Sequence, residues 1–276
     1  MGFHQKYIRS ADKNRSLVCV GLDPDPKRLP THLQGKPDAV LTFLRDIILA
    51  TQDLVCAYKP NFAFYGAMGM RGWETLTGVV ETIPDDIPII LDYKAGDISN
   101  SASRYAAMAY EQLKVDAVTV NPLMGHDAVM PFLDYKDRCA FLLCLTSNPG
   151  SADLQRLSAD GKPLYEILAC KAVSWSTDGP CGLVVGATHP DEMRKVRDIA
   201  PNLPILVPGI GAQGGEAERV IANGQDASSR GLLVNTSRSV LYASGSLDFA
   251  DAARKAAESL RQRIEAARVA DCAGAP

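Results

Sequence analysis

The sequence has no concentration of charge of one sign. Its 29 basic and 32 acidic residues give a formal net charge of −3, and they form no run of like charge. Nucleic acids and anionic membranes bind proteins that gather basic residues on one surface. We therefore expect no nucleic acid and no membrane as a partner, while the composition leaves room for a local basic site that binds a small anion.

Long apolar runs and paired cysteines are also missing. The longest uncharged stretch, residues 199–215, is interrupted by three prolines and four glycines and is no candidate for a membrane span. The seven cysteines form no C-x-x-C pair, and several lie in apolar runs, as Cys19 and Cys144 do. They are typical of reduced, buried residues. Because residues 1–6 carry no apolar signal region, we expect a cytoplasmic protein.

Short apolar runs that alternate with longer helical patterns dominate the chain. Eight runs rich in Val, Ile and Leu are nearly continuous, as expected of parallel strands buried on both faces. They span residues 17–22, 54–59, 87–93, 117–121, 140–146, 181–187, 205–208 and 231–235. Helical patterns follow at residues 38–53, 101–113, 191–199 and 248–269.

No linker or change of composition interrupts this series. The pattern predicts an α/β protein with a single (β/α)8 TIM barrel as its one domain over residues 1–276. We expect the barrel core at about residues 16–245, a C-terminal helix at about 248–269 and a frayed tail from residue 270. The alternative is a doubly wound open sheet, which predicts a dinucleotide fingerprint after the first strand. The turn there reads GLDPDP at residues 21–26, which is no such loop.

Polar residues follow nearly every predicted strand at its carboxyl end. Reactive groups of barrel enzymes lie at these ends and in the loops after them. A single residue of this kind is usually an exposed loop residue or part of a structural ion pair, but their shared placement at one rim indicates a site. They are Asp23, Lys59, Asp92, Lys94, Asp97, Asn121, Ser147 and Arg238.

Asp92 and Lys94 are the strongest candidates for catalysis. Residues two apart on a strand point to the same face, so we expect this carboxylate and ammonium to lie side by side. Asp23 and Lys59 are expected on adjacent strands, which gives alternating charges across the barrel mouth. An ammonium flanked by carboxylates keeps its proton. It is a poor Schiff-base nucleophile but a good proton donor and a good stabiliser of a carbanion.

The glycine-rich segment after the seventh predicted strand is similar to a phosphate cradle. Residues 208–215 read PGIGAQGG, and backbone N–H groups of glycines can approach an anion closely. Barrels commonly bind phosphate with the loops after strands seven and eight. Without further residues, the glycines are explained equally well by a tight turn that binds no phosphate. Arg238, just past the eighth strand, can clamp the same phosphate and favours the phosphate interpretation.

These residues together resemble the orotidine 5′-phosphate decarboxylase family. Residues 92–98, DYKAGDI, resemble its D-x-K-x-x-D-I signature, and further segments follow in the family order between residue 17 and about residue 243. They are GLD at 21–23, YKP at 58–60, SNPG at 147–150, PGIGAQGG at 208–215 and SRS at 237–239. The overall length is similar to that of the longer bacterial-type variants.

The resemblance implies a carboxy-lyase that converts orotidine 5′-monophosphate to uridine 5′-monophosphate and CO2 in de novo pyrimidine biosynthesis, without a cofactor and without a metal. It implies that Lys94 protonates C6 of the pyrimidine as CO2 leaves, with Asp92 beside the substrate carboxylate. It further implies that Asp97 is contributed by the partner subunit of a homodimer.

The remaining site residues are implied by the same resemblance. Lys59 and Asp23 complete the charged array and hold the ribose hydroxyls, and Ser147 reads the pyrimidine edge. Gln213 and Arg238 bind the phosphate, Gln213 from a loop that closes over the substrate. The other expected substrate-binding residues are Ile98 and Ser101, at partner-subunit contacts, together with Asn121 and Pro208. Ser237 departs from the family, in which many members have glycine directly before the arginine.

Three other functions fit the residues less well. A metal-dependent phosphosugar decarboxylase, synthase or epimerase needs carboxylates or histidines around a divalent ion, whereas Lys59 puts positive charge there and the four histidines show no ligand spacing. A class I aldolase needs a neutral Lys94. A nucleotide sensor on an inactive barrel is expected to have lost Lys94 or a carboxylate neighbour. At this length we expect no fused phosphoribosyltransferase.

Overall fold

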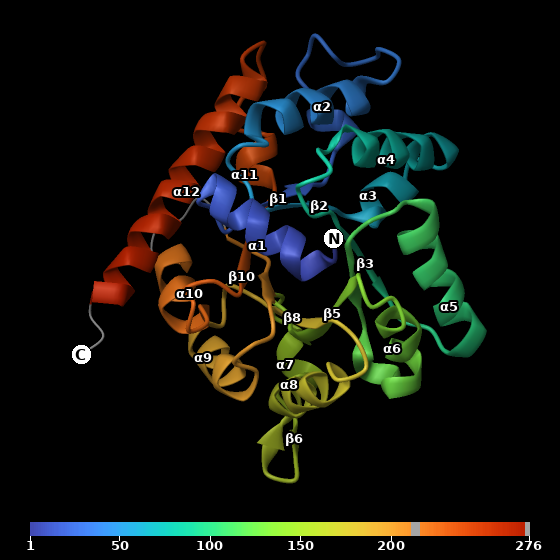
Figure 1. The fold of residues 1–276 in the computed structure, drawn as a ribbon. Helices are drawn as coiled ribbons and strands as arrows, with labels where there is room; N and C mark the ends of the chain where they lie inside the picture. Colours follow the sequence, from blue (N-terminus) through green and yellow to red (C-terminus); the bar gives the residue numbers. More distant parts are fainter. Residues whose placement is uncertain (211–215, 274–276) are drawn as a thin grey trace.

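Eight parallel strands, each followed by at least one helix, form a barrel in the computed structural model, which describes residues 1–210 and 216–273 (Figure 1). The strands are β1 (Val18–Leu22), β2 (Ala57–Pro60), β3 (Ile90–Ala95), β4 (Ala117–Val120), β5 (Cys139–Leu145), β8 (Cys181–Val185), β9 (Ile205–Val207) and β10 (Leu232–Thr236). Neighbours pair in the order β2-β1-β10-β9-β8-β5-β4-β3. Parallel bridges Tyr58↔Ile89 and Asn61↔Asp92 join the two ends of this order. The predicted TIM barrel is confirmed, and the open sheet is excluded.

The strands lie where the apolar runs predicted them, with small differences at their ends. All residues of β1, β8 and β10 are buried, which is why these strands are rich in apolar residues, although β10 ends in the buried polar residues Asn235 and Thr236. The runs that begin at residues 54 and 87 start too early, because β2 begins at Ala57 and β3 at Ile90. The earlier apolar residues, such as Leu54 and Ile87, are part of the core. Ile89 pairs through its isolated bridge to Tyr58.

Helices surround the barrel, and no helix in the described part of the chain is both long and apolar enough to cross a membrane (Figure 1). They are α2 (Ala39–Thr51), α3 (Phe62–Gly66), α4 (Met70–Thr82), α5 (Ser99–Ala107), α6 (His126–Leu133), α7 (Ser151–Leu154), α8 (Leu164–Trp175), α9 (Pro190–Ile199), α10 (Glu216–Gly224), α11 (Arg238–Leu241) and α12 (Phe249–Ala273). Short turns complete them: η1 (Pro26–Arg28), η2 (Met108–Gln112) and η3 (Pro122–Met124).

A helix that the sequence analysis did not predict closes the amino-terminal end of the barrel. α1 (Phe3–Asn14) lies across the centre of the view in Figure 1. Its Tyr7 hydroxyl donates to the Leu232 carbonyl at 3.0 Å, and Phe3 packs edge-on against Phe141 with 5.5 Å between ring centroids. Because these contacts fill the amino-terminal end, the carboxyl-terminal end of the strands is the one that remains for a site.

One expectation at the periphery of the fold is corrected. The tail was expected from residue 270, but α12 continues to Ala273. The polar stretch 151–163 folds into α7 and a small hairpin of β6 (Ser158–Ala159) and β7 (Lys162–Pro163). The hairpin turns at Asp160 and Gly161, which both have positive φ, and it projects away from the barrel (Figure 1).

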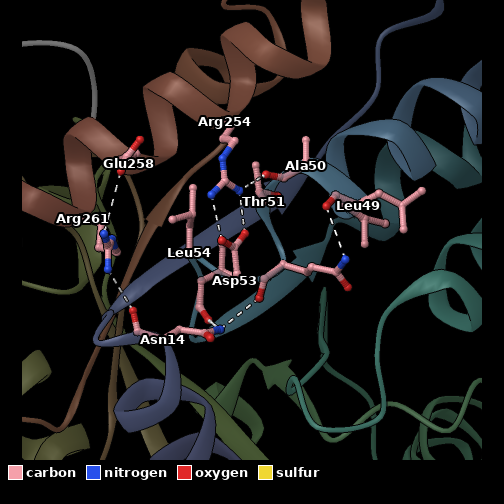
Figure 2. Close-up of polar contacts among 12 residues, drawn as sticks. Asn14, Leu49, Ala50, Thr51, Asp53, Leu54, Arg254, Glu258 and Arg261 are labelled. Atoms are coloured by element: carbon pink, nitrogen blue, oxygen red, sulfur yellow. Dashed lines mark hydrogen bonds and ion pairs between the residues drawn. The ribbon is translucent and has the colours of Figure 1, made fainter.

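Arginines of α12 hold this helix against the ends of α1 and α2 (Figure 2). Arg254 forms a bidentate pair with Asp53, with Nη1–Oδ1 at 2.6 Å and Nη2–Oδ2 at 2.8 Å, and donates to the Ala50 carbonyl at 2.7 Å. Arg261 donates to the Asn14 carbonyl at 3.2 Å. α12 therefore ties together segments that are about 200 residues apart in the sequence.

Replacing Arg254 with alanine is expected to lower the free energy of unfolding by about 1 kcal/mol near neutral pH, because the pair is bidentate but substantially exposed. The hydrogen-bonded Arg254 guanidinium holds the pKa of Asp53 below its usual range. The stabilisation is therefore present above the unfolded-state value, near pH 4, and is lost as pH falls through the lower folded-state value. Urea unfolding of both proteins at about pH 7 and about pH 3 measures the difference. Arg45→Ala, which replaces an exposed arginine of α2, is the control. If Arg254→Ala lowered the free energy of unfolding equally at both pH values, the role of Asp53 would be wrong.

Candidate active site

Four charged residues follow one another across the carboxyl ends of β1, β2 and β3. Gly21 pairs with Lys59 in the register of β1 and β2, so Asp23 lies just past β1 near the end of β2. Lys59 Nζ lies 2.7 Å from Asp92 Oδ2, and Lys94 Nζ lies 2.7 Å from Asp92 Oδ1. Asp92 and Lys94 therefore lie side by side, as the sequence analysis expected. We call Asp23, Lys59, Asp92 and Lys94 the charged row.

Burial and charge act against each other in this row. Burial alone lowers the pKa of Lys59, but the carboxylates of Asp92 and Asp23 raise this pKa above its usual range. Burial alone raises the pKa of Asp92, but the ammonium groups of Lys59 and Lys94 hold it well below its usual range. Lys59 is 3% exposed, whereas the Lys94 side chain is 49% exposed. Lys59 and Asp92 thus keep their charges at neutral pH, and Lys94 is the ammonium that solvent reaches.

The backbone at Lys94 departs from a regular strand. Lys94 has a φ of 50°, and the register of β3 and β4 shifts between Leu91 and Ala95. Thr119 of β4 lies against this bulge: its Oγ1 donates to Asp92 Oδ1 at 2.9 Å and accepts from the Lys94 backbone N–H at 3.0 Å. The contact between Asp92 and Lys94 therefore depends on a bulge, not on the simple alternation that the sequence analysis assumed.

A cavity of about 710 Å³ opens at the ends of β1, β9 and β10. Arg28 and Arg238 both line it, and two guanidinium groups suit an anion such as a phosphate. Asp23 Oδ1 is buried without a hydrogen-bond partner, which leaves an acceptor for a ligand hydroxyl. The lining residues are Asp23, Asp25, Arg28, Phe64, Gly209, Ile210, Asn235, Ser237, Arg238, Ser239 and Tyr242.

Arg28 and Tyr242 were missed by the sequence analysis. The Arg28 guanidinium lies 3.9 Å from the centroid of the Tyr242 ring, and the Tyr242 hydroxyl accepts from the Asp25 backbone N–H at 2.6 Å. These contacts tie the loop after β1 to the segment after β10 across the cavity. No local pattern points to them, because 217 positions separate Asp25 from Tyr242.

Two glycines make room for loops of the site. A Cβ built on Gly21 would lie 1.9 Å from Ser237 Oγ, so the serine directly before Arg238 fits only because residue 21 has no side chain. A Cβ built on Gly186 would lie 2.7 Å from the Ser147 backbone. Glycine at these two positions therefore sets how closely the loops approach.

Ser147 lies near the cavity, on a loop that is fixed through its neighbour. Its Oγ is 3.6 Å from a Cβ built on Gly209, which lines the cavity. Thr146 donates its backbone N–H to Gln155 Oε1 at 2.7 Å, and its carbonyl lies 3.0 Å from His189 Nε2. Gln155 and His189 thereby hold the loop that carries Ser147.

The other predicted residues lie apart from the charged row or serve local structure. The Asn121 side chain accepts from the Leu123 N–H at 3.1 Å, and the Pro208 carbonyl accepts from the Ala187 N–H at 3.0 Å. Gln213 lies outside the described residues.

Asp97, Ile98 and Ser101 lie on the loop after β3 and at the start of α5. Asp97 Oδ1 accepts from the Ile98 N–H at 2.8 Å, and both Ile98 and Ser101 are exposed. Within residues 1–210 and 216–273, no group of three or more His, Cys, Asp or Glu side chains is arranged to hold a metal ion.

Comparisons with known proteins point to one family. The family model described as "Orotidine 5'-phosphate decarboxylase / HUMPS family" matches residues 16–256. Two curated proteins named orotidine 5'-phosphate decarboxylase are each 49% identical to this chain. The match to the protein from Herpetosiphon aurantiacus covers 93% of this chain and 96% of that protein. The match to the protein from Azoarcus sp. covers 95% of this chain and 98% of that protein.

Solved structures give the same result. The Leishmania donovani OMP decarboxylase has a TM-score of 0.86 at 38% identity and covers 98% of this chain and 99% of its own. The Leishmania donovani UMP synthase has a TM-score of 0.85 at 39% identity, and the match covers 96% of this chain and 57% of that protein.

Proposed function

The chain belongs to the orotidine 5′-phosphate decarboxylase / HUMPS family, and we propose that it converts orotidine 5′-monophosphate to uridine 5′-monophosphate and CO2 with Lys94 as the proton donor. The charged row carries this proposal. The ammonium groups of Lys59 and Lys94 are each bonded to one oxygen of Asp92. This arrangement suits a reaction in which negative charge develops beside Lys94. The same arrangement argues against the activity of the metal-dependent relatives, because the Lys59 ammonium is bonded to the Asp92 carboxylate that a divalent metal ion would need as a ligand.

The reaction needs a fixed positive charge next to the carbon that loses CO2. Breakage of the bond between C6 and the carboxylate leaves the electron pair on C6 in the plane of the pyrimidine ring, where the ring π electrons do not delocalise it. A preorganised ammonium stabilises this charge without reorganisation. The Lys94 ammonium then transfers a proton to C6, which gives uridine 5′-monophosphate, and the neutral amine regains a proton from the solvent that reaches it.

Asp92 and Lys59 prepare Lys94 for this step. Asp92 keeps its negative charge and holds the Lys94 ammonium at 2.7 Å, while Lys59 balances its second oxygen. A negative carboxylate near the substrate carboxylate also adds repulsion that is relieved when CO2 leaves. The row therefore combines proton donation with charge stabilisation.

The rest of the substrate is assigned to the cavity. We place the phosphate at Arg238, with Arg28 as a second guanidinium that lines the same cavity, and a ribose hydroxyl at the unpartnered Asp23 Oδ1. Ser147 reads the pyrimidine edge. Binding energy from the distant phosphate is then available to orient the pyrimidine against Lys94.

A second copy of this chain is the proposed partner. Ile98, directly after Asp97 on the loop between β3 and α5, is an exposed apolar residue, and Tyr105 is another on α5. Exposed apolar side chains that gather on one face mark interaction sites. In the proposed homodimer the partner covers this loop, and Asp97, Ile98 and Ser101 complete the partner's site.

Purified protein is expected to convert orotidine 5′-monophosphate in the presence of excess EDTA, with CO2 and uridine 5′-monophosphate formed in equal amounts. Release of labelled CO2 and chromatography of the nucleotide measure both products. Protein incubated with a phosphosugar and Mg²⁺ is the comparison. A requirement for Mg²⁺, or turnover of the phosphosugar instead, would assign the chain to the metal-dependent relatives.

A further inference from the structure

Thr119 contacts both groups that act on the reacting carbon. It lies in β4, only 1% exposed, and one hydroxyl serves two bonds: it donates to Asp92 Oδ1 at 2.9 Å and accepts from the Lys94 N–H at 3.0 Å. We propose that Thr119 is a positioning residue whose hydroxyl holds the bulge that places the Lys94 ammonium against Asp92. This inference rests on the proposed decarboxylation.

The bulge needs such a support. Leu91 pairs with Val118 and Ala95 pairs with Val120, so three residues of β3 face the single residue Thr119. Lys94, the last of the three, has a φ of 50°, which is unfavourable for a residue with a side chain. Its N–H bonds to the Thr119 side chain. A conformation of this kind persists only where its surroundings hold it.

The same hydroxyl fixes the orientation of the carboxylate. Asp92 Oδ2 is held by the buried Lys59, but Oδ1 is shared by Thr119 and the half-exposed Lys94. Without the hydroxyl, only a flexible lysine would hold Oδ1, and rotation of the carboxylate would displace the ammonium. The phosphate is assigned to Arg238, four strands away along the barrel, so substrate binding does not depend on Thr119.

Thr119→Val removes the hydroxyl at nearly constant volume. We expect it to lower kcat by about 10- to 100-fold with little change in KM, because misplacement of a reacting group by about 1 Å has an effect of this size. Thr119→Ser keeps the hydroxyl and is expected to restore most of kcat. Thr51→Val, on α2, is the matched control. It also removes a buried hydroxyl, which bonds the Ile47 carbonyl and the hydroxyl of Tyr58 in β2, and kcat is expected to stay unchanged.

A crystal structure of Thr119→Val provides a readout that does not depend on turnover. We expect Lys94 to leave the left-handed region or its Nζ to move away from Asp92 Oδ1. Wild-type kcat in folded Thr119→Val, no rescue by serine, or an unchanged Lys94 conformation would overturn the positioning role. If the valine variant does not fold, Thr119→Ala replaces it in both measurements. A wild-type protein without decarboxylase activity would refute the proposed function, while the crystal structure would still decide the role of Thr119.

Discussion

Lys94→Ala is expected to lower kcat for orotidine 5′-monophosphate by at least about 10⁴-fold, because it removes two effects at once. A positioned general acid contributes about 10²- to 10⁴-fold, and a preorganised charge beside a developing anion contributes about 10²- to 10³-fold. The barrel is expected to stay folded, since the Lys94 side chain is half exposed and Asp92 keeps its bond to Lys59. Labelled CO2 release measures turnover, and circular dichroism with thermal unfolding measures the fold.

Two further variants make this test specific. Lys162→Ala, on the exposed hairpin, removes a lysine far from the charged row and is expected to leave kcat unchanged. Lys94→Arg keeps a positive charge but not an acidic proton, because a guanidinium stays protonated. We expect its kcat to lie between those of the wild type and the alanine variant. If Lys94→Ala kept a kcat within about tenfold of wild type, the proton-donor role would be wrong.

The sequence predicts the barrel because its strands are buried on both faces. A strand such as Val18–Leu22 carries apolar side chains on both sides, so its pattern is visible without any knowledge of its neighbours. α1 is different: its residues Phe3 and Tyr7 become core residues only through contacts with strands more than 100 positions away. A short, mostly polar segment gives no local sign of such a docking site.

The charged row could be predicted because the carboxyl ends of parallel strands meet at one rim. Charged residues at the ends of two adjacent strands are expected to lie close together, as Lys59 and Asp92 do. The bulge at Lys94 could not be predicted, since it depends on the register of β3 against β4. The one available sign was Thr119, a polar residue inside the apolar run at 117–120.

Asp97 is the member of the family signature that we assign to the partner subunit. In its own chain the Asp97 carboxylate bonds to the Ile98 N–H and forms no hydrogen bond or ion pair with Asp92 or Lys94 among the described residues. The neighbouring Ile98 is an exposed apolar side chain and is suited to contact with another protein surface. A shared site explains both observations, because Asp97 then completes the charged row of the second subunit.

Mixing inactive Lys94→Ala with inactive Asp97→Ala is expected to restore about one quarter of the wild-type activity, because random exchange makes half of the dimers mixed and each of these has one intact site. In a mixed dimer, the Asp97→Ala subunit supplies Lys94 and its partner supplies Asp97, whereas the other site lacks both. Turnover is followed after exchange of two differently tagged proteins, and capture of both tags measures the fraction of mixed dimers.

The proposed shared site also predicts which mixture stays inactive. Lys94→Ala mixed with a Lys94→Ala, Asp97→Ala double variant forms the same dimers but has no Lys94 in any site, so no activity is expected. If the first mixture also stayed inactive although mixed dimers were captured, Asp97 would act within its own chain, and the loop after β3 would have to fold back toward Lys94. If activity rose in proportion to the captured mixed dimers, Asp97 would act across the interface, and the exposed surface around Ile98 would be part of every active site.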